Sequence, residues 1–165
     1  MLAKIGLPAP EDIAAIIPSN SRLQQGPIAI FECFQKIPCN PCADACPRGA
    51  IYPFSDINEC PSVDENRCNG CGVCLAHCPG LSIFVVDYTY GATEALVKIP
   101  YEFVPLPQTD EVVIALNRTG SPLGTAQVVR IQRNANKTTI LWLTVPKELA
   151  MQVRHIARRK ESYNE

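Results

Sequence analysis

The chain has 165 residues, of which 47% are hydrophobic, so its length allows one ordinary domain or two small ones. No apolar run reaches the roughly 18–20 residues that a membrane-spanning helix needs. Residues 1–20 contain acids and prolines where a signal peptide would have an apolar stretch and a small-residue cleavage site. We therefore expect no membrane span and a cytoplasmic location.

The formal net charge of −1 is unevenly distributed along the chain. Residues 27–90 contain seven acids and three bases, a net charge of −4, whereas residues 91–165 contain ten bases and seven acids, a net charge of +3. Two interpretations are open. In the first, the two segments simply have solvated surfaces of opposite charge. In the second, one of these surfaces is a docking surface that attracts a partner of complementary charge.

The N-terminal residues 1–26 are rich in Pro, Ser, Asn and Gln and show little periodicity, which predicts an extended arm. A short apolar strand is expected next, at residues 28–31, and a second one at residues 82–87. Between these strands lie all nine cysteines of the chain. We therefore expect a cysteine-rich domain over residues 27–92.

The cysteines stand at positions 33, 39, 42, 46, 60, 68, 71, 74 and 78, and the last 87 residues of the sequence contain none. An even set spread along a secreted chain would indicate a disulfide framework. An odd, clustered set without an export signal instead favours a metal site in a reducing compartment.

The first cysteine group is irregular. Cys39, Cys42 and Cys46-Pro47 have the spacing of a bacterial ferredoxin run, but the position where its first cysteine is expected holds Lys36. One interpretation is that Cys33 supplies the missing ligand from a longer loop. In the other, the site holds a three-iron cluster or is completed by Cys60. We favour Cys33, because it lies beside the other ligands at the end of an apolar strand.

The second group, residues 68–79, reads C-x2-C-x2-C-x3-C-P, the ferredoxin signature for [4Fe–4S] clusters. Three closely spaced thiolates on a tight turn can wrap one cubane, and Gly70 and Gly72 permit the backbone angles of that turn. Zinc is the alternative, but zinc sites normally use two C-x2-C pairs.

In a two-cluster ferredoxin the fourth cysteine of each run ligates the other cluster. This rule predicts two [4Fe–4S] clusters whose ligand sets are crossed. The first cluster is assigned Cys33, Cys39, Cys42 and Cys78. The second cluster is assigned Cys46, Cys68, Cys71 and Cys74.

Residues 93–165 are expected to form a small β domain. Strands are predicted at 111–116, 125–132 and 138–145, separated by turn-forming residues. Pro146 is suited to the first turn of a helix, and an apolar stripe follows at Leu149, Val153 and Ile156. The predicted class is α+β: a dicluster ferredoxin-like domain, then a small β-sheet or barrel with a C-terminal helix. The β domain shows no catalytic constellation, so we expect it to serve in docking.

Several stretches resemble known families. Residues 68–87, CNGCGVCLAHCPGLSIFVVD, resemble dicluster bacterial-type ferredoxin domains. Residues 26–51, GPIAIFECFQKIPCNPCADACPRGAI, resemble the ferredoxin-like subunits of FAD-dependent amine or amino-acid dehydrogenases of the proline and hydroxyproline type, and residues 98–107 are similar to the same subunits. The resemblance implies a non-catalytic subunit of a hetero-oligomer. Electrons would pass from FAD-containing dehydrogenase subunits through its clusters to a second flavin or an external acceptor.

Two other functions are considered. A free ferredoxin shuttle with an appended interaction domain is less consistent with the chain, because such shuttles are usually short and strongly acidic. A nucleic-acid-binding role for the basic residues 154–160 lacks interleaved aromatic residues and a wider basic patch. We therefore expect no nucleic acid partner.

Overall fold

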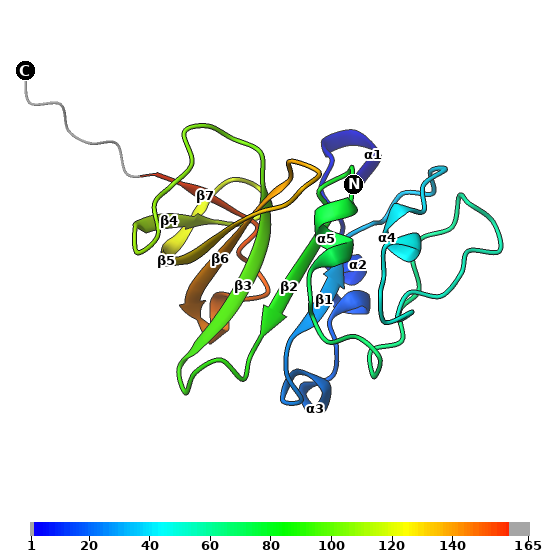
Figure 1. The fold of residues 1–165 in the computed structure, drawn as a ribbon, viewed down its shortest axis with the longest axis horizontal. Helices are drawn as coiled ribbons and strands as arrows, with labels where there is room; N and C mark the ends of the chain where they lie inside the picture. The colour runs from blue at the N-terminus through cyan, green and yellow to red at the C-terminus, as the bar shows by residue number, and fades with distance from the viewer. Residues whose placement is uncertain (1, 159–165) are drawn as a thin grey trace, which may run out of the picture.

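A computed structural model describes residues 2–158, and its main feature is one antiparallel sheet of seven strands in the order β1-β2-β3-β6-β5-β4-β7 (Figure 1). The strands are β1 Ile28–Phe31, β2 Ile83–Asp87, β3 Glu94–Tyr101, β4 Val112–Leu116, β5 Pro122–Arg133, β6 Thr139–Pro146 and β7 His155–Ala157. The expected strands correspond to β1, β2, β4, β5 and β6. Segments 27–92 and 93–165 therefore contribute strands to the same sheet.

The helices are short, and three of them lie in the N-terminal segment, which is not the extended arm that its composition suggests. Pro10 occupies the first turn of α2, and the Ala9 N–H donates to the Asp12 carboxylate over 2.9 Å. Ser19 caps α3 by accepting from the Arg22 N–H. The α-helices are α1 Leu2–Ile5, α2 Pro10–Ile16, α3 Asn20–Leu23, α4 Pro41–Asp44 and α5 Val73–His77. No helix in the described range is long and apolar enough to cross a membrane.

Strands β1 and β2 are buried on both faces. Successive side chains of a strand point to opposite faces of the sheet. On β1, Ile28 and Ile30 accordingly enter the larger of two hydrophobic cores, while Ala29 and Phe31 enter the smaller one. The smaller core also contains Cys42 and Cys74 from the cysteine-rich loops. These two strands thus separate the cysteine-rich loops from the larger core (Figure 1).

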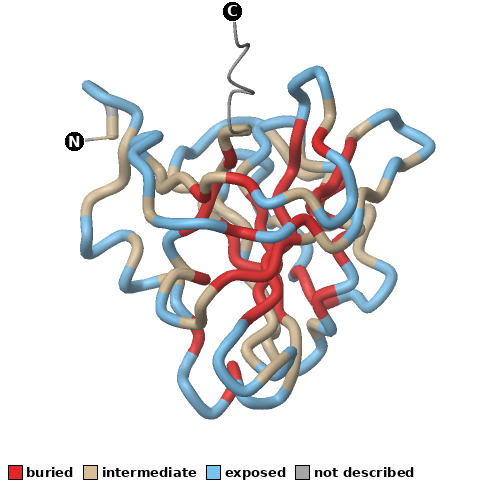
Figure 2. The backbone as a smooth tube through the Cα atoms, turned by 90° about the vertical axis from the view of Figure 1, so that its left-hand side faces the viewer, coloured by how far each residue is buried: buried red, intermediate tan, exposed pale blue. Residues whose placement is uncertain are grey.

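All seven strands contribute side chains to the larger core. Ile28 of β1 and Ile156 of β7 belong to it, although β1 and β7 are the two edges of the sheet. The sheet therefore curls round this core as a partly open barrel, and no backbone pairing joins β1 to β7 within the described residues. Buried residues occupy the centre of the molecule, with exposed loops around them (Figure 2).

The prediction of a C-terminal helix is wrong. A single 3-10 turn, Lys147–Leu149, is followed by the strand β7, which pairs antiparallel with β4. Ile156 lies opposite Ala115, and the Arg154 N–H donates to the Leu116 carbonyl over 2.9 Å. The exposed edge of β4 offers these residues backbone partners, which outweighs the helical spacing of their apolar side chains.

Candidate iron–sulfur centre

The cysteines are carried by the loops on the outer side of β1 and β2. Cys33 follows the end of β1, Cys42 lies in α4, and Cys74 lies in α5. Helices α4 and α5 pack against each other, which brings the two cysteine groups together (Figure 1). Segments far apart in sequence therefore face one another across the smaller core.

Cys46, Cys68, Cys71 and Cys74 line one cavity, the second-cluster cavity, together with apolar side chains that include Phe31, Ile51 and Val63. The empty space among its lining atoms, part of which is open to solvent, is about 340 Å³. This is the ligand set that crossed ligation assigns to the second cluster. The structure therefore brings together one cysteine of the first group and three of the second.

Another cavity, the first-cluster cavity, is lined by Cys33, Cys39, Cys42 and Cys78. The empty space among its lining atoms, part of which is open to solvent, is about 380 Å³. The two cavities are alike in having four cysteines each and mainly apolar walls. Phe31 lines both cavities. The two sites are therefore neighbours that share an aromatic wall.

The thiols surround each cavity and do not meet at one point. Within residues 2–158, no three His, Cys, Asp or Glu side chains converge in the way that the ligands of a single metal ion do. A cubane lies between its four thiolates and holds them apart. The donor set of four thiols around a mainly apolar cavity fits such a group.

Burial governs the acidity of the thiols. Desolvation raises the pKa of Cys74 to about 12 and that of Cys42 to about 11, and it also raises the pKa of Cys33. Desolvation alone would raise the pKa of Cys46, but backbone N–H groups of residues 48–51 outweigh it and lower that pKa. Without a bound metal to stabilise the thiolates, the thiols of Cys33, Cys42 and Cys74 keep their protons at neutral pH.

Backbone N–H groups also point at the sulfurs. The Ala50 N–H donates to the Cys46 Sγ over 3.3 Å, and the Ala29 N–H donates to the Cys68 Sγ over 3.4 Å. At the first-cluster cavity, the Ser82 N–H donates to the Cys78 Sγ over 3.4 Å. Hydrogen bonds to cluster sulfurs are one of the means by which proteins set cluster potentials.

Gly70 holds a position that no other residue would fill without strain. Its φ is +60°, and an added Cβ would stand 2.6 Å from the Cβ of Pro27. Gly72 has a φ of +85° where α5 begins. The close approach of the turn to residue 27 thus explains Gly70, and the left-handed backbone conformation explains Gly72.

Cys60 lies near the first-cluster cavity but does not line it. Glu59 and Pro61 are among the residues that do, whereas Cys60 lines a neighbouring cavity with Cys33. The charge of Cys60 contributes, after desolvation, to the raised pKa of Cys33. This placement favours Cys33 over Cys60 as the ligand, and Cys60 stands close enough to be tested as a substitute.

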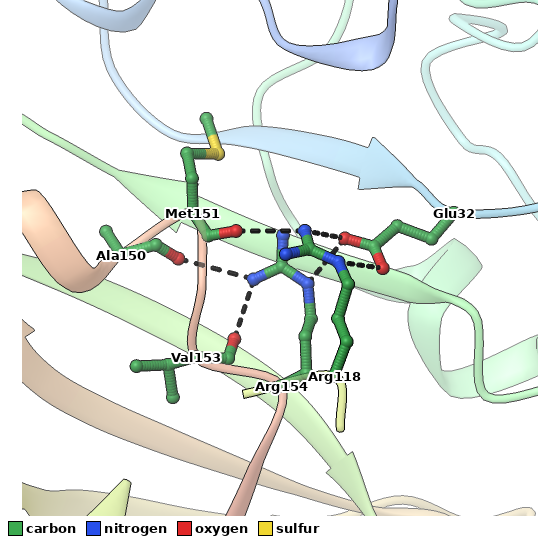
Figure 3. Close-up of polar contacts among 6 residues, drawn as sticks. All are labelled: Glu32, Arg118, Ala150, Met151, Val153 and Arg154. Atoms are coloured by element: carbon green, nitrogen blue, oxygen red, sulfur yellow. Dashed lines mark hydrogen bonds and ion pairs between the residues drawn. The ribbon is translucent and has the colours of Figure 1, made fainter. Parts of the chain in front are cut away.

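A buried ionic cluster lies next to Cys33. Glu32 accepts hydrogen bonds from Arg118 and from Arg154, the latter over 2.6 Å between Arg154 Nε and Glu32 Oε1 (Figure 3). Arg154 also donates to the carbonyls of Ala150 and Val153, and burial lowers its pKa to about 10. Cysteine spacing contains no signal for this cluster, because the three residues are far apart in sequence.

The described part of the basic stretch 154–160 is not helical and contains the strand β7. Arg154 is buried, and Arg158 donates to Glu111 over 2.7 Å. His155 packs edge-on against Phe103 with ring centroids 4.9 Å apart. Residues 159 and 160 lie outside the described residues. The described part of the stretch therefore serves internal contacts.

Comparison with known proteins gives partial similarities to electron-transfer proteins. The chain is 49% identical over 39 residues to the thiosulfate reductase electron transfer subunit PhsB of Salmonella typhi, covering 24% of this chain and 19% of that protein. It is 44% identical over 45 residues to an uncharacterized ferredoxin of Methanocaldococcus jannaschii (27% and 28%). It is 35% identical over 60 residues to the ferredoxin-type protein NapF of Escherichia coli K12 (34% and 35%).

The chain thus spans between 19% and 35% of the length of these curated relatives. No family model matches the sequence, and no solved structure matches it. The similarities relate the chain to ferredoxin-type iron–sulfur proteins and support an electron-transfer role.

Proposed function

We propose that this chain is the electron-transfer subunit of a cytoplasmic, hetero-oligomeric flavoenzyme. In this proposal residues 27–92 hold two [4Fe–4S] clusters with the crossed ligand sets given above. The subunit relays electrons from FAD-containing dehydrogenase subunits to a second flavin or an external acceptor. The observation that carries the proposal is the pair of similar cavities, each lined by four cysteines drawn from both groups.

The residues of the chain have distinct roles in this function. When bound, each cluster would take up and release one electron at a time. The eight thiolates hold the clusters, and Phe31, Ile51 and Ile83 keep water away from them. Because Phe31 borders both cavities, it contributes an apolar aromatic ring to the wall of each site.

The choice of partner rests on two kinds of support. Residues 26–51 and 98–107 resemble the ferredoxin-like subunits of proline- and hydroxyproline-type dehydrogenases. PhsB, by its name, is also a subunit of a larger enzyme. A free shuttle is the alternative, and the shared sheet argues against it, because 93–165 is built into the fold that carries the ligands.

Metal and sulfide analysis tests the cofactor. Protein purified without oxygen should contain about eight iron and about eight acid-labile sulfide per chain, because two cubanes carry four of each. Cys71→Ser should lower both contents, and Cys60→Ser serves as the matched control that leaves them unchanged. Zinc without labile sulfide would disprove the cluster assignment.

Isolation of the native complex tests the partner separately. The protein should copurify with a subunit that contains FAD and reduces its flavin when an amine or amino acid is added. Iron-loaded protein that copurifies with no flavoprotein would leave the electron-transfer role standing and reject the flavoenzyme partner.

A further inference from the structure

Two buried cations contact the loop that carries the second-cluster ligands. Arg22 of α3 donates to the carbonyls of Cys68 (2.8 Å) and Glu65 (2.7 Å), and its side chain is held from the other side by the carbonyls of residues 26 and 27. Lys98 of β3 donates from Nζ to the Gly70 carbonyl over 2.8 Å. Both residues are only 6% exposed.

These cations have hydrogen-bond partners, but within residues 2–158 no carboxylate forms an ion pair with either of them. Among the described residues, the ion pairs are Glu32 with Arg118 and Arg154, and Glu111 with Arg158. Asp87 acts on Lys98 only as a more distant charge. Buried charges are normally paired, because taking an isolated charge out of water is costly. Negative charge held by their loop would therefore add to that of Asp87 and balance Arg22 and Lys98.

The two cations approach the ligands from different sides. Arg22 contacts the backbone of Cys68 itself, and Lys98 contacts Gly70, the neighbour of Cys71. Lys98 also lies over the ring of Trp142, 4.0 Å from its centroid, which fixes the position of the ammonium group. Arg48 adds a further positive charge to the wall of the same cavity.

The first-cluster cavity has a different charge environment. Glu59 lines it, and the nearby Arg118 and Arg154 share the carboxylate of Glu32, so that their combined charge is partly neutralised. Four backbone N–H groups, those of residues 48–51, act on Cys46 of the second set, whereas Ser82 donates the N–H···Sγ hydrogen bond to Cys78 of the first set. Each of these differences favours negative charge at the second cavity over the first.

We propose that Arg22 and Lys98 are the counter-ions of the second cluster and that they make it the centre of higher reduction potential. The inference rests on the two-cluster function proposed above. Reduction adds one electron to a cluster that is already negative, and no bond forms or breaks. A nearby buried cation therefore stabilises the reduced form. Transfer from the first cluster to the second is then downhill, and a single electron in the chain resides on the second cluster.

A redox titration of the full-length, cluster-loaded protein tests the order of potentials. Dithionite supplies the electrons, and electron paramagnetic resonance follows the two reduction steps. Cys33→Ala, which removes a first-cluster ligand, identifies the steps. The step at higher potential should survive in this variant unchanged. If the surviving four-iron step is the one at lower potential, the proposal is overturned.

Three variants test the role of Lys98. Lys98→Met removes the charge and should shift the higher-potential step to a more negative value, leaving the other step in place. Lys98→Arg keeps the charge and should restore the wild-type value. Arg130→Gln is the matched control, because Arg130 stacks on the same Trp142 ring, 4.8 Å from its centroid, without contacting the ligand loop.

The outcomes distinguish failure of this inference from failure of the two-cluster function on which it rests. Unchanged potentials in Lys98→Met, or a shift confined to the lower-potential step, would reject the inference while the clusters remain. Protein without iron and labile sulfide would reject the function itself. If Lys98→Met does not retain the second cluster, the proposal is tested by the wild-type protein and Cys33→Ala. The step that survives in Cys33→Ala must then be the one at higher potential.

Discussion

The carboxylate of Glu32 accepts a hydrogen bond from Arg154 across the two edges of the sheet. Glu32 follows β1, and Arg154 immediately precedes β7, so their 2.6 Å contact joins strands that are six positions apart in the sheet order (Figure 3). Side chains thus close the barrel where backbone pairing does not. The same contact fixes the residue next to Cys33.

We expect Glu32→Ala to be strongly destabilising. Glu32 is 9% exposed and Arg154 5%, so the variant leaves two arginines buried or half-buried without their carboxylate. Removing one partner of a buried ion pair costs about 3–5 kcal/mol. Chemical denaturation measures the loss. Glu111→Ala, which breaks the more exposed pair with Arg158, is the control and should cost less than about 1 kcal/mol. Equal losses in the two variants would contradict this account.

Cys33→Ala should convert the first site to a three-iron cluster or empty it. Cys33 is the one cysteine in the sequence upstream of Cys39, and it lines that cavity. An oxidised three-iron signal in electron paramagnetic resonance would appear where a pair of four-iron clusters is silent until reduced. In the proposed complex, flavin reduction by substrate should persist while turnover to the acceptor falls. Wild-type iron content and turnover in this variant would disprove the ligand assignment.

Cys60→Ser is the companion variant, because Cys60 lies close to Cys33 outside the cavity. It should keep both clusters. The double variant Cys33→Ala, Cys60→Ser tests whether Cys60 replaces the missing ligand. A four-iron first site in Cys33→Ala that disappears in the double variant would identify such a replacement.

The protein without clusters should lose stability at high pH. Its buried Cys74 has a pKa of about 12 against an ordinary value of 9.0, so the folded state holds a proton that the unfolded state releases. This contribution is complete below pH 9.0 and is lost as pH rises toward 12. Urea midpoints from about pH 8 to pH 11 should therefore fall. Cys74→Ser, which does not ionise, should show a flatter dependence, and an equally steep curve would refute the assignment.

A chain that ends at residue 92 should not hold its clusters stably. Without β3 and the strands beyond it, Ile28, Ile30, Phe84 and Val86 lose the cover of the larger core. Exposing four such side chains costs about 6 kcal/mol or more, which is comparable with the whole stability of a typical domain, about 5–15 kcal/mol. Iron content and circular dichroism of the shortened chain check this. Full cluster loading with wild-type thermal stability would show that residues 27–92 are independent.

Cysteine spacing anticipates which residues line each cavity, because ligand geometry imposes short, fixed intervals on the chain. Strand β3 is not predicted, since Lys98 and Pro100 interrupt its apolar pattern. Pro100 is nevertheless accommodated opposite Ile140. The contacts of Arg22 and Lys98 are beyond prediction, because their carbonyl partners at Cys68 and Gly70 lie 46 and 28 residues away. Their existence depends on the tertiary fold.

Trp142, the single tryptophan of the chain, contacts the side chains of Lys98 and Arg130 through its ring and donates from Nε1 to Gln132 over 3.2 Å. It packs against the smaller core, which also holds Cys46 and Cys74. Iron–sulfur clusters absorb light in the range where tryptophan emits. If the proposed second cluster is bound, Trp142 fluorescence should increase when the cluster is lost and decrease when it is rebuilt.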